Sequence, residues 1–500
     1  MKNKSIFFYQ FIAVCIFAYT MNFINIRSIQ KKNPANTEQN ARSLVNNETI
    51  FSIDNEWYLN QIKNLQHGYG FTHDTSNYLY TVRRTPLYPL FYGVHYLIFG
   101  EKGSFAAIKY SQIIIFGISA VFLFLATLNF TNNRKIAWLT YILYGFNLPL
   151  ISYLSFTLTE AVFPALICFI LYFLSRCKLS SNGTNWFMVG LFYSIAVLTR
   201  PNIVFILSTI IFCILYYNKF VFKKIITNGC FFVFGLSLLF TPWVIRNYIK
   251  TNGDIVILEK YYGDQMDYGM PNMHLKYWIA CWINPADYSS ERISNCIIKN
   301  INDNEPVSGK ELVDSLLNTI PPVVFKGNNK NEIKDSYSVL YNYYKAKKIN
   351  KNSHEFYKIE KKSILLFKNM KSDFISNAPL QYYILTPLSY LKSLIFQSNS
   401  STLIYIEDFK TNKLAWVVKF CLFLLNVFCF TAIPLLLFYK EHTDIFWSTF
   451  LFSASTIFII FFVNKNFEAR YIFQLFPYLF ISLSVVCIET YERIKLKLNF

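Results

Sequence analysis

Ten apolar segments of roughly membrane-spanning length are spread along this 500-residue chain. A helix needs about 20 consecutive apolar residues to cross the hydrocarbon core of a bilayer. Hydrophobic residues make up 53% of the chain and charged residues 15%, whereas about 25% of a soluble domain is charged. The sequence therefore predicts an all-α polytopic membrane protein with about ten transmembrane helices, at 5–26, 105–129, 135–153, 158–176, 184–199, 201–217, 224–245, 415–439, 445–463 and 470–488.

Two further apolar patches, 86–99 and 379–397, are interpreted as interfacial helices. The first would be about 21 Å long as a helix, short of the roughly 30 Å core. With a cytoplasmic N-terminus, the basic loops at 132–135, 176–178 and 218–224 and the tail at 493–497 then all lie in the cytoplasm. This arrangement obeys the positive-inside rule, so we expect a multi-pass protein of the cell membrane (an inner or plasma membrane). The first segment lacks a cleavage site and is expected to be a retained helix.

The ten-helix topology divides the chain into three parts. Residues 1–245 form a transmembrane module whose first extracytoplasmic loop is 27–104, residues 246–414 form a large extracytoplasmic loop domain, and residues 415–500 hold the last transmembrane helices and a cytoplasmic tail. Within the loop domain, 326–362 is expected to form a pair of surface helices. Cys281 and Cys296 could pair if the domain faces an oxidising compartment, and the sequence leaves this open. The net charge of +19 is explained by membrane topology, so nucleic acid is not an expected partner.

In this topology the unusual polar residues of the transmembrane module collect at the extracytoplasmic boundary. Arginines in a low-dielectric mouth bind phosphate through charge-assisted contacts, and a carboxylate beside them can take a proton from an attacking hydroxyl. Neighbouring aromatic rings suit a sugar face or a lipid tail. The candidates are the acids Asp54 and Glu160, the arginines Arg83, Arg84, Arg200, Arg246 and Arg470, and the tyrosines Tyr58, Tyr88 and Tyr471.

Each of these features has a simpler explanation. Glu160 fits the start of a helix, where the dipole favours an acid, and arginines such as Arg200 can extend to lipid headgroups. Interfacial belts of Tyr and Trp are common. Glu56 competes with Asp54 for the role of the functional acid. The histidines show no metal-ligand spacing, so no resident metal site is expected, although a divalent cation held by Asp54 and a substrate phosphate stays open.

Five motifs in order along the chain resemble the GT-C glycosyltransferases, closest to the protein O-mannosyltransferases and lipid A aminoarabinose transferases, which use polyprenyl-phosphate sugars. The resemblance covers 1–260 and 440–490, through "DNEWY" (54–58), "RRTPLYPLFYGVHYLIFG" (83–100), "LTRPN" (198–202), "TPWVIRNYIKTNG" (241–253) and "ARYIFQLFPYLF" (469–480). It implies that the first seven helices form the shared GT-C module. It also implies that Asp54 is the base of an inverting transfer, that Glu160 is a second acid in the same cavity, and that the arginines hold the lipid phosphate. Lys63 corresponds to a basic residue that the aminoarabinose transferases often carry.

The expected function is therefore transfer of a sugar from a polyprenyl-phosphate lipid to a lipid, glycan or protein acceptor on the extracytoplasmic face. The expected partners are that donor lipid, membrane lipids and an acceptor that the sequence does not identify. A transporter or flippase for a lipid-linked sugar is the main alternative, but transporters usually show repeats and ionisable groups at the bilayer midplane. A catalytically inactive relative of the glycosyltransferases is the third possibility.

Overall fold

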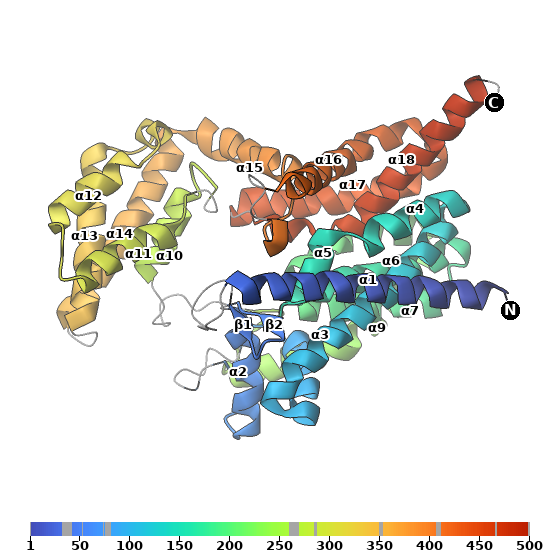
Figure 1. Ribbon diagram of the computed structural model, residues 1–500, viewed down its shortest axis with the longest axis horizontal. Coiled ribbons are helices and arrows are strands. Elements are labelled where there is room, and N and C mark those ends of the chain that lie inside the picture. Colours follow the sequence, from blue (N-terminus) through green and yellow to red (C-terminus); the bar gives the residue numbers. More distant parts are fainter. Residues whose placement is uncertain are drawn as a thin grey trace. The chain divides into compact units, whose positions relative to one another are not determined.

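The computed structural model describes residues 2–32, 43–52, 54–73, 75, 82–259, 270–284, 288–349, 354–406, 412–465 and 468–498. It is 81% helical (Figure 1). The chain divides into two compact units, the first made of Met1–Tyr261, Phe396–Thr456 and Arg470–Phe500, and the second of Tyr262–Ile395 and Ile457–Ala469. The predicted boundaries at 246 and 414 describe membrane topology, whereas the compact units describe contacts within the fold. The boundaries therefore stay a prediction.

The first unit contains the long apolar helices and one short hairpin. Its elements are α1 (Lys2–Lys32), β1 (Leu44–Val45), β2 (Thr49–Ile50), α2 (Asp54–Gln66), α3 (Leu87–Thr131), α4 (Arg134–Gly145), α5 (Leu148–Tyr153), α6 (Phe163–Leu179), α7 (Gly183–Thr199), α8 (Leu207–Tyr217), α9 (Phe222–Lys250), α16 (Lys413–Leu435), α17 (Thr443–Phe458) and α18 (Phe476–Lys497). β1 and β2 pair antiparallel, with Leu44 opposite Ile50.

Six helical segments in the described part of the chain are long and apolar enough to cross a membrane. Two more apolar segments, Gly183–Thr199 and Pro201–Tyr217, are shorter. These helices fit an α-helical, multi-pass membrane protein, but they do not confirm a count of ten. The six segments are Ser5–Lys32, Leu87–Thr131, Thr159–Leu179, Phe222–Lys250, Lys413–Phe438 and Lys440–Val463.

One predicted span and one predicted interfacial helix differ in the structure for local reasons. The segment 135–153 is two helices, α4 and α5, because Asn147 caps the second one by accepting from the backbone N–H of Leu150, and Pro149 lies in its first turn. The patch 86–99 is helical and runs into the next span. The join is kinked at Gly100, whose φ of 67° breaks the helical path within α3.

Helix packing in the first unit centres on α3 and α7. α3 packs against α1, α4 and α6, and α7 packs against α6 and α9. At the α7–α9 crossing, a Cβ on Gly190 would lie 2.0 Å from the carbonyl oxygen of Phe232, and one on Gly235 would lie 2.2 Å from that of Phe187. Only glycine at both positions allows the two backbones to approach this closely, as is common between membrane helices.

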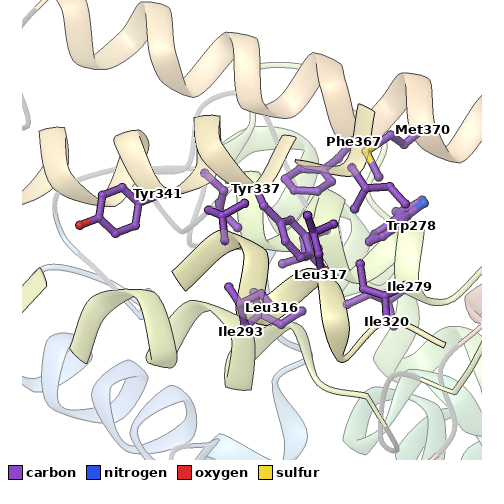
Figure 2. Close-up of a cluster of buried hydrophobic side chains, with 14 of the residues drawn as sticks. Trp278, Ile279, Ile293, Leu316, Leu317, Ile320, Tyr337, Tyr341, Phe367 and Met370 are labelled. Atoms are coloured by element: carbon purple, nitrogen blue, oxygen red, sulfur yellow. The ribbon is translucent and has the colours of Figure 1, made fainter. Parts of the chain in front are cut away.

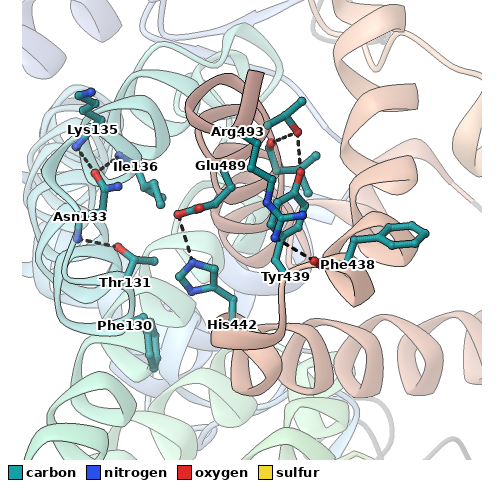
Figure 3. Close-up of polar contacts among 12 residues, drawn as sticks. Phe130, Thr131, Asn133, Lys135, Ile136, Phe438, Tyr439, His442, Glu489 and Arg493 are labelled. Atoms are coloured by element: carbon teal, nitrogen blue, oxygen red, sulfur yellow. Dashed lines mark hydrogen bonds and ion pairs between the residues drawn. The ribbon is translucent and has the colours of Figure 1, made fainter. Parts of the chain in front are cut away.

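One end of this unit gathers the basic loops that the topology assigns to the cytoplasm. Lys178 forms an ion pair with buried Asp444 at 2.8 Å and donates to the carbonyl of Phe130, while Lys135 pairs with Glu492 of α18 at 2.5 Å. Figure 3 shows the α3–α4 connection beside α18, where His442 Nε2 lies 3.5 Å from Glu489. Loops far apart in sequence therefore share one end of the helices, as a common membrane face requires.

The second unit is a helical domain with its own apolar core. Its helices are α10 (Met270–Ile279), α11 (Ser290–Asn302), α12 (Gly309–Asn318), α13 (Lys330–Ile349), α14 (His354–Asn377) and α15 (Thr386–Ile395), with a π-helical turn at Ile459–Asn464. Trp278, Tyr337, Phe367 and Leu317 meet in its core (Figure 2).

The structure tests two predictions about this part of the chain. The predicted helix pair at 326–362 is confirmed by α13 and α14, although these helices also supply core residues such as Tyr343 and Phe356. The disulfide that the sequence left open is not formed, because Cys281 is buried, Cys296 is exposed and both thiols are free.

Candidate functional site

A polar cavity of about 210 Å³ lies in the first unit, where several connecting segments meet. It collects three carboxylates and three arginines from parts of the chain up to 416 residues apart, the separation of Asp54 and Arg470. The lining residues are Asp54, Tyr58, Arg84, Thr85, Thr159, Glu160, Thr199, Arg200, Pro201, Asn202, Glu259, Arg470 and Tyr471. We call this cavity the arginine pocket.

Glu160 is the buried centre of the charge network in the arginine pocket. Its side chain is only 2% exposed, and Oε1 lies 2.9 Å from Arg200 Nη1 and 3.1 Å from Arg470 Nη1. The hydroxyl of Thr159 donates to Oε2 at 3.0 Å and accepts from Arg200 Nη1 at 2.8 Å. A carboxylate bound on both oxygens in this way fixes the two guanidinium groups in the cavity wall.

Asp54 occupies the opposite side of the network and is more open. It is the first residue of α2, and its side chain is 33% exposed. Its oxygens lie 3.5 Å from Arg84 Nη2 and 3.5 Å from Arg470 Nη1, which is longer than a good charge-assisted hydrogen bond. Asp54 is thus held near two cations without being locked to either.

Local sequence signals place these charges at the ends of helices. Arg200 follows the last residue of α7 and is extended (φ −147°, ψ 112°), as expected for a residue before proline. Pro201 then begins a short 3₁₀ segment. Arg470 lies in another 3₁₀ turn, Ala469–Ile472, and Glu160 in a third, Thr159–Ala161. The apolar helices bring these turns together, and the turns carry the charged side chains of the arginine pocket.

Aromatic rings surround the guanidinium groups. The Arg200 guanidinium lies 4.9 Å from the centre of the Phe163 ring and 5.8 Å from that of Tyr471, and Arg84 lies 5.9 Å from the ring of Tyr58. Burial raises the pKa of Tyr58, opposed by Arg84 and reinforced by Glu160 and Asp54. Tyr58 is therefore a neutral phenol at physiological pH, able to donate a hydrogen bond.

Seven of the ten candidate residues from the sequence line the arginine pocket: Asp54, Tyr58, Arg84, Glu160, Arg200, Arg470 and Tyr471. The other three do not. Arg83 is buried with its guanidinium 3.6 Å from the ring centre of Trp57. Tyr88 donates to Gln112 Oε1 at 2.9 Å inside the helix bundle.

The prediction that Arg246 lines the same cavity is wrong. Arg246 Nη2 donates to the carbonyl oxygen of Phe71 at 2.7 Å, and Nη1 donates to Asn247 Oδ1 at 2.8 Å. The Trp243 ring centre lies 5.0 Å from the guanidinium. These contacts fasten the end of α9 to the segment after α2, and Arg246 is not among the residues that line the arginine pocket.

The structure also shows where two other residues considered in the sequence analysis, Glu56 and Lys63, lie. Glu56 is exposed and is not a lining residue, so Asp54 is the acid of "DNEWY" that faces the cavity. Lys63 pairs with Glu101 at 2.5 Å on the surface of the first unit. Lys63 therefore has no contact with the arginine pocket.

Glu259 is the lining residue that sequence reasoning missed. Desolvation raises the pKa of Glu259, and the positive charges of Arg84, Arg200 and Arg83 oppose that shift. It belongs to the segment that follows α9, between Arg246 and the second unit, where no motif marks it. Its place in the cavity depends on this segment folding back to the arginine pocket, which the sequence does not indicate.

No group of three or more His, Cys, Asp or Glu side chains is arranged to hold a metal ion in the described ranges. The two open oxygens of Asp54 face arginines. The arginines beside Asp54 make this part of the cavity better suited to binding an anion than a cation.

The sequence matches no protein-family model and no curated protein. The arginine pocket is consequently interpreted from its own geometry.

Proposed function

We propose that this protein is a membrane glycosyltransferase. It transfers a sugar from a polyprenyl-phosphate donor to a lipid, glycan or protein acceptor at the extracytoplasmic face. The observation that carries the proposal is the position of Asp54 between Arg84 and Arg470, in a cavity whose other wall is the Glu160–Arg200–Arg470 network.

The arginines supply a site for the donor phosphate. Arg84, Arg200 and Arg470 line one cavity, and guanidinium groups bind phosphate oxygens in bidentate fashion. Glu160 neutralises part of this charge but also fixes the orientation of Arg200 and Arg470. A preorganised cation stabilises the charge that develops on a phosphate leaving group without reorganising during the reaction.

Asp54 is suited to act as the general base. Its side chain is 33% exposed in the arginine pocket, and its oxygens lie 3.5 Å from Arg84 and 3.5 Å from Arg470. An acceptor hydroxyl that enters the cavity beside the donor phosphate can therefore reach the Asp54 carboxylate.

The transfer balances with these groups alone. An acceptor hydroxyl gives its proton to Asp54 and attacks the anomeric carbon from the face opposite the phosphate. A new C–O bond forms while the bond between the anomeric carbon and the phosphate oxygen breaks, and the electron pair leaves with the polyprenyl phosphate. The sugar inverts, the arginines hold the product phosphate, and Asp54 releases its proton to water.

The side of the membrane follows from the basic loops. α7 runs from Gly183, beside the basic 176–178 loop, to Thr199, beside Arg200. Its 17 residues span about 26 Å, close to the thickness of the hydrocarbon core. Because the basic loops favour the cytoplasm, the arginine pocket belongs to the extracytoplasmic face.

The proposal is tested with purified protein and radiolabelled polyprenyl-phosphate sugars, presented with membrane extracts that contain lipid, glycan and protein acceptors. A transferase moves label from the donor to an acceptor fraction. In sealed proteoliposomes, a flippase moves the labelled donor across the bilayer with the sugar–phosphate bond intact. Movement without cleavage would replace the proposed function with transport.

A further inference from the structure

A second cavity, of about 230 Å³, lies between α1, α3 and the β1–β2 hairpin and shares no lining residue with the arginine pocket. Three charged side chains line it: Arg27 from α1, Glu48 from the hairpin turn and Lys109 from α3. Tyr19, Phe23 and Tyr110 are among its other lining residues. We call it the α1–α3 cavity.

Lys109 is an unusual residue for its position. It lies in the apolar helix Leu87–Thr131, and its side chain is 8% exposed. Lysines within membrane helices are rare because a charge in the hydrocarbon is costly, and they usually mark a site. Its Nζ lies 2.6 Å from Glu48 Oε2, and the Glu48 side chain is 36% exposed.

The hairpin turn is built to present Glu48 to Lys109. Asn46 and Asn47 both have positive φ, 50° and 59°, a conformation that asparagine tolerates, and the Glu48 N–H donates to the carbonyl of Val45. The turn is anchored by Ile50, whose N–H donates to the carbonyl of Ser155. The ion pair is thus a fixed part of the cavity wall.

Arg27 gives the cavity an excess of positive charge. It is exposed, its guanidinium lies 5.2 Å from the Phe23 ring centre, and Nη1 donates to Gln30 Oε1 at 3.3 Å. Among the described lining residues, two cations and one carboxylate give a net charge of one positive unit. That charge complements a single phosphodiester anion.

The aromatic wall identifies the source of that phosphate. Tyr19, Phe23 and Tyr110 are 47%, 49% and 45% exposed, on helices of membrane-spanning length. The rings of Tyr19 and Tyr110 stack across the α1–α3 junction at 6.2 Å. A free phosphate ion needs no such surface, whereas the glycerol and acyl chains of a lipid do.

We propose that the α1–α3 cavity binds the headgroup of one phospholipid, with its phosphate between Arg27 and Lys109 and its chains over Tyr19, Phe23 and Tyr110. The site is independent of the proposed transferase activity.

Native mass spectrometry of the detergent-purified protein, titrated with phosphatidylglycerol, tests this site. The unmodified protein should retain one tightly bound lipid. Arg27→Gln should weaken that binding about tenfold or more, because a charge-assisted contact is lost. Tyr19→Leu, which keeps the charges, should weaken it less but measurably.

Arg176→Gln is the matched control, since Arg176 is an exposed arginine near the C-terminus of α6, among the basic loops. It should leave the tight lipid in place. Equal losses with Arg27→Gln and Arg176→Gln would mean that the lipid is annular and would overturn the site. Displacement of the lipid by millimolar inorganic phosphate would equally overturn it, in favour of a site for the free ion.

Discussion

Glu160 and Arg200 form a nearly solvent-free ion pair at 2.9 Å, between the turn that precedes α6 and the residue that follows α7. The same carboxylate also contacts Arg470, at 3.1 Å. A buried pair of this kind is weak evidence for stability by itself, but breaking it leaves an uncompensated charge. Its value here is to fix two arginines in the arginine pocket.

Glu160→Gln should therefore destabilise the protein strongly. Removing one partner of a buried pair costs about 3–5 kcal/mol, because Arg200 keeps its charge and loses its counter-ion. Thermal unfolding in detergent measures the effect. Glu101→Gln is the control, since it breaks the exposed pair with Lys63 and should cost no more than about 1 kcal/mol. Equal shifts for the two variants would show that the Glu160 network is not a structural centre.

Substitutions of Arg470 and Arg246 should have different effects on the kinetics. Arg470→Gln removes a cation from the arginine pocket and should raise the KM for the donor about tenfold or more. Arg246→Gln should leave that KM within about twofold but lower the unfolding temperature, because the Phe71 carbonyl loses its donor. Steady-state kinetics with varied donor, beside thermal unfolding, gives both readings. A large rise in the KM for the donor with Arg246→Gln would show that Arg246 belongs to the donor site.

Lys465 should make the stability of the second unit depend on alkaline pH. It is buried, it donates to the carbonyl of Tyr382 at 2.8 Å, and desolvation lowers its pKa to about 8 from 10.5. Between these values the unfolded chain holds a proton that the folded chain has released, so stability rises with pH across this window. Below about pH 8 both states are protonated and the contribution is constant.

The measurement is the unfolding temperature of the unmodified protein and of Lys465→Met across that window. The unmodified protein should gain stability relative to Lys465→Met as the pH rises. Lys299→Met, at an exposed position of α11, should follow the unmodified protein. Parallel curves for Lys465→Met and the unmodified protein would contradict the assignment.

Membrane topology is tested with single cysteines in a background that lacks the ten native ones. Cysteine at Ser180, just after the basic loop 176–178, or at Lys224, at the end of the basic loop 218–224, should react with an impermeant maleimide only after the cells are permeabilised. Cysteine at Lys310, in α12 of the second unit, should react in intact cells. Labelling of Ser180→Cys in intact cells would reverse the orientation and move the arginine pocket to the cytoplasm.

Some of the arginine pocket could be predicted from the sequence because charged residues at the ends of apolar segments are expected to lie at the membrane boundary. Glu160, Arg200 and Arg470 interrupt or border an apolar run, while Asp54 lies in the loop 27–104, and the structure brings all four to one cavity. The direction of a side chain at a helix end was not predictable. Arg246 borders the predicted span 224–245 in the same way, yet it turns toward the Phe71 carbonyl.

Other features depend on contacts between distant segments, which one sequence does not contain. Glu259 carries no motif and reaches the cavity only because the segment after α9 returns to it. Lys109 and Glu48 pair across 61 residues. The break between α4 and α5 had a local signal in Asn147 and Pro149, but the surrounding apolar residues outweighed it in a prediction based on hydropathy.

The central claim is that Asp54 is the base of a sugar transfer, and the most direct test is the rate of transfer by Asp54→Asn. This variant keeps the size of the side chain and removes the proton acceptor. General base catalysis is worth about 10²–10⁴-fold, so single-turnover transfer from a radiolabelled polyprenyl-phosphate sugar should slow by that factor. Glu56→Gln, at the exposed acid in the same turn of α2, should transfer at nearly the normal rate. Normal transfer by Asp54→Asn, with the protein folded and inserted, would contradict the account.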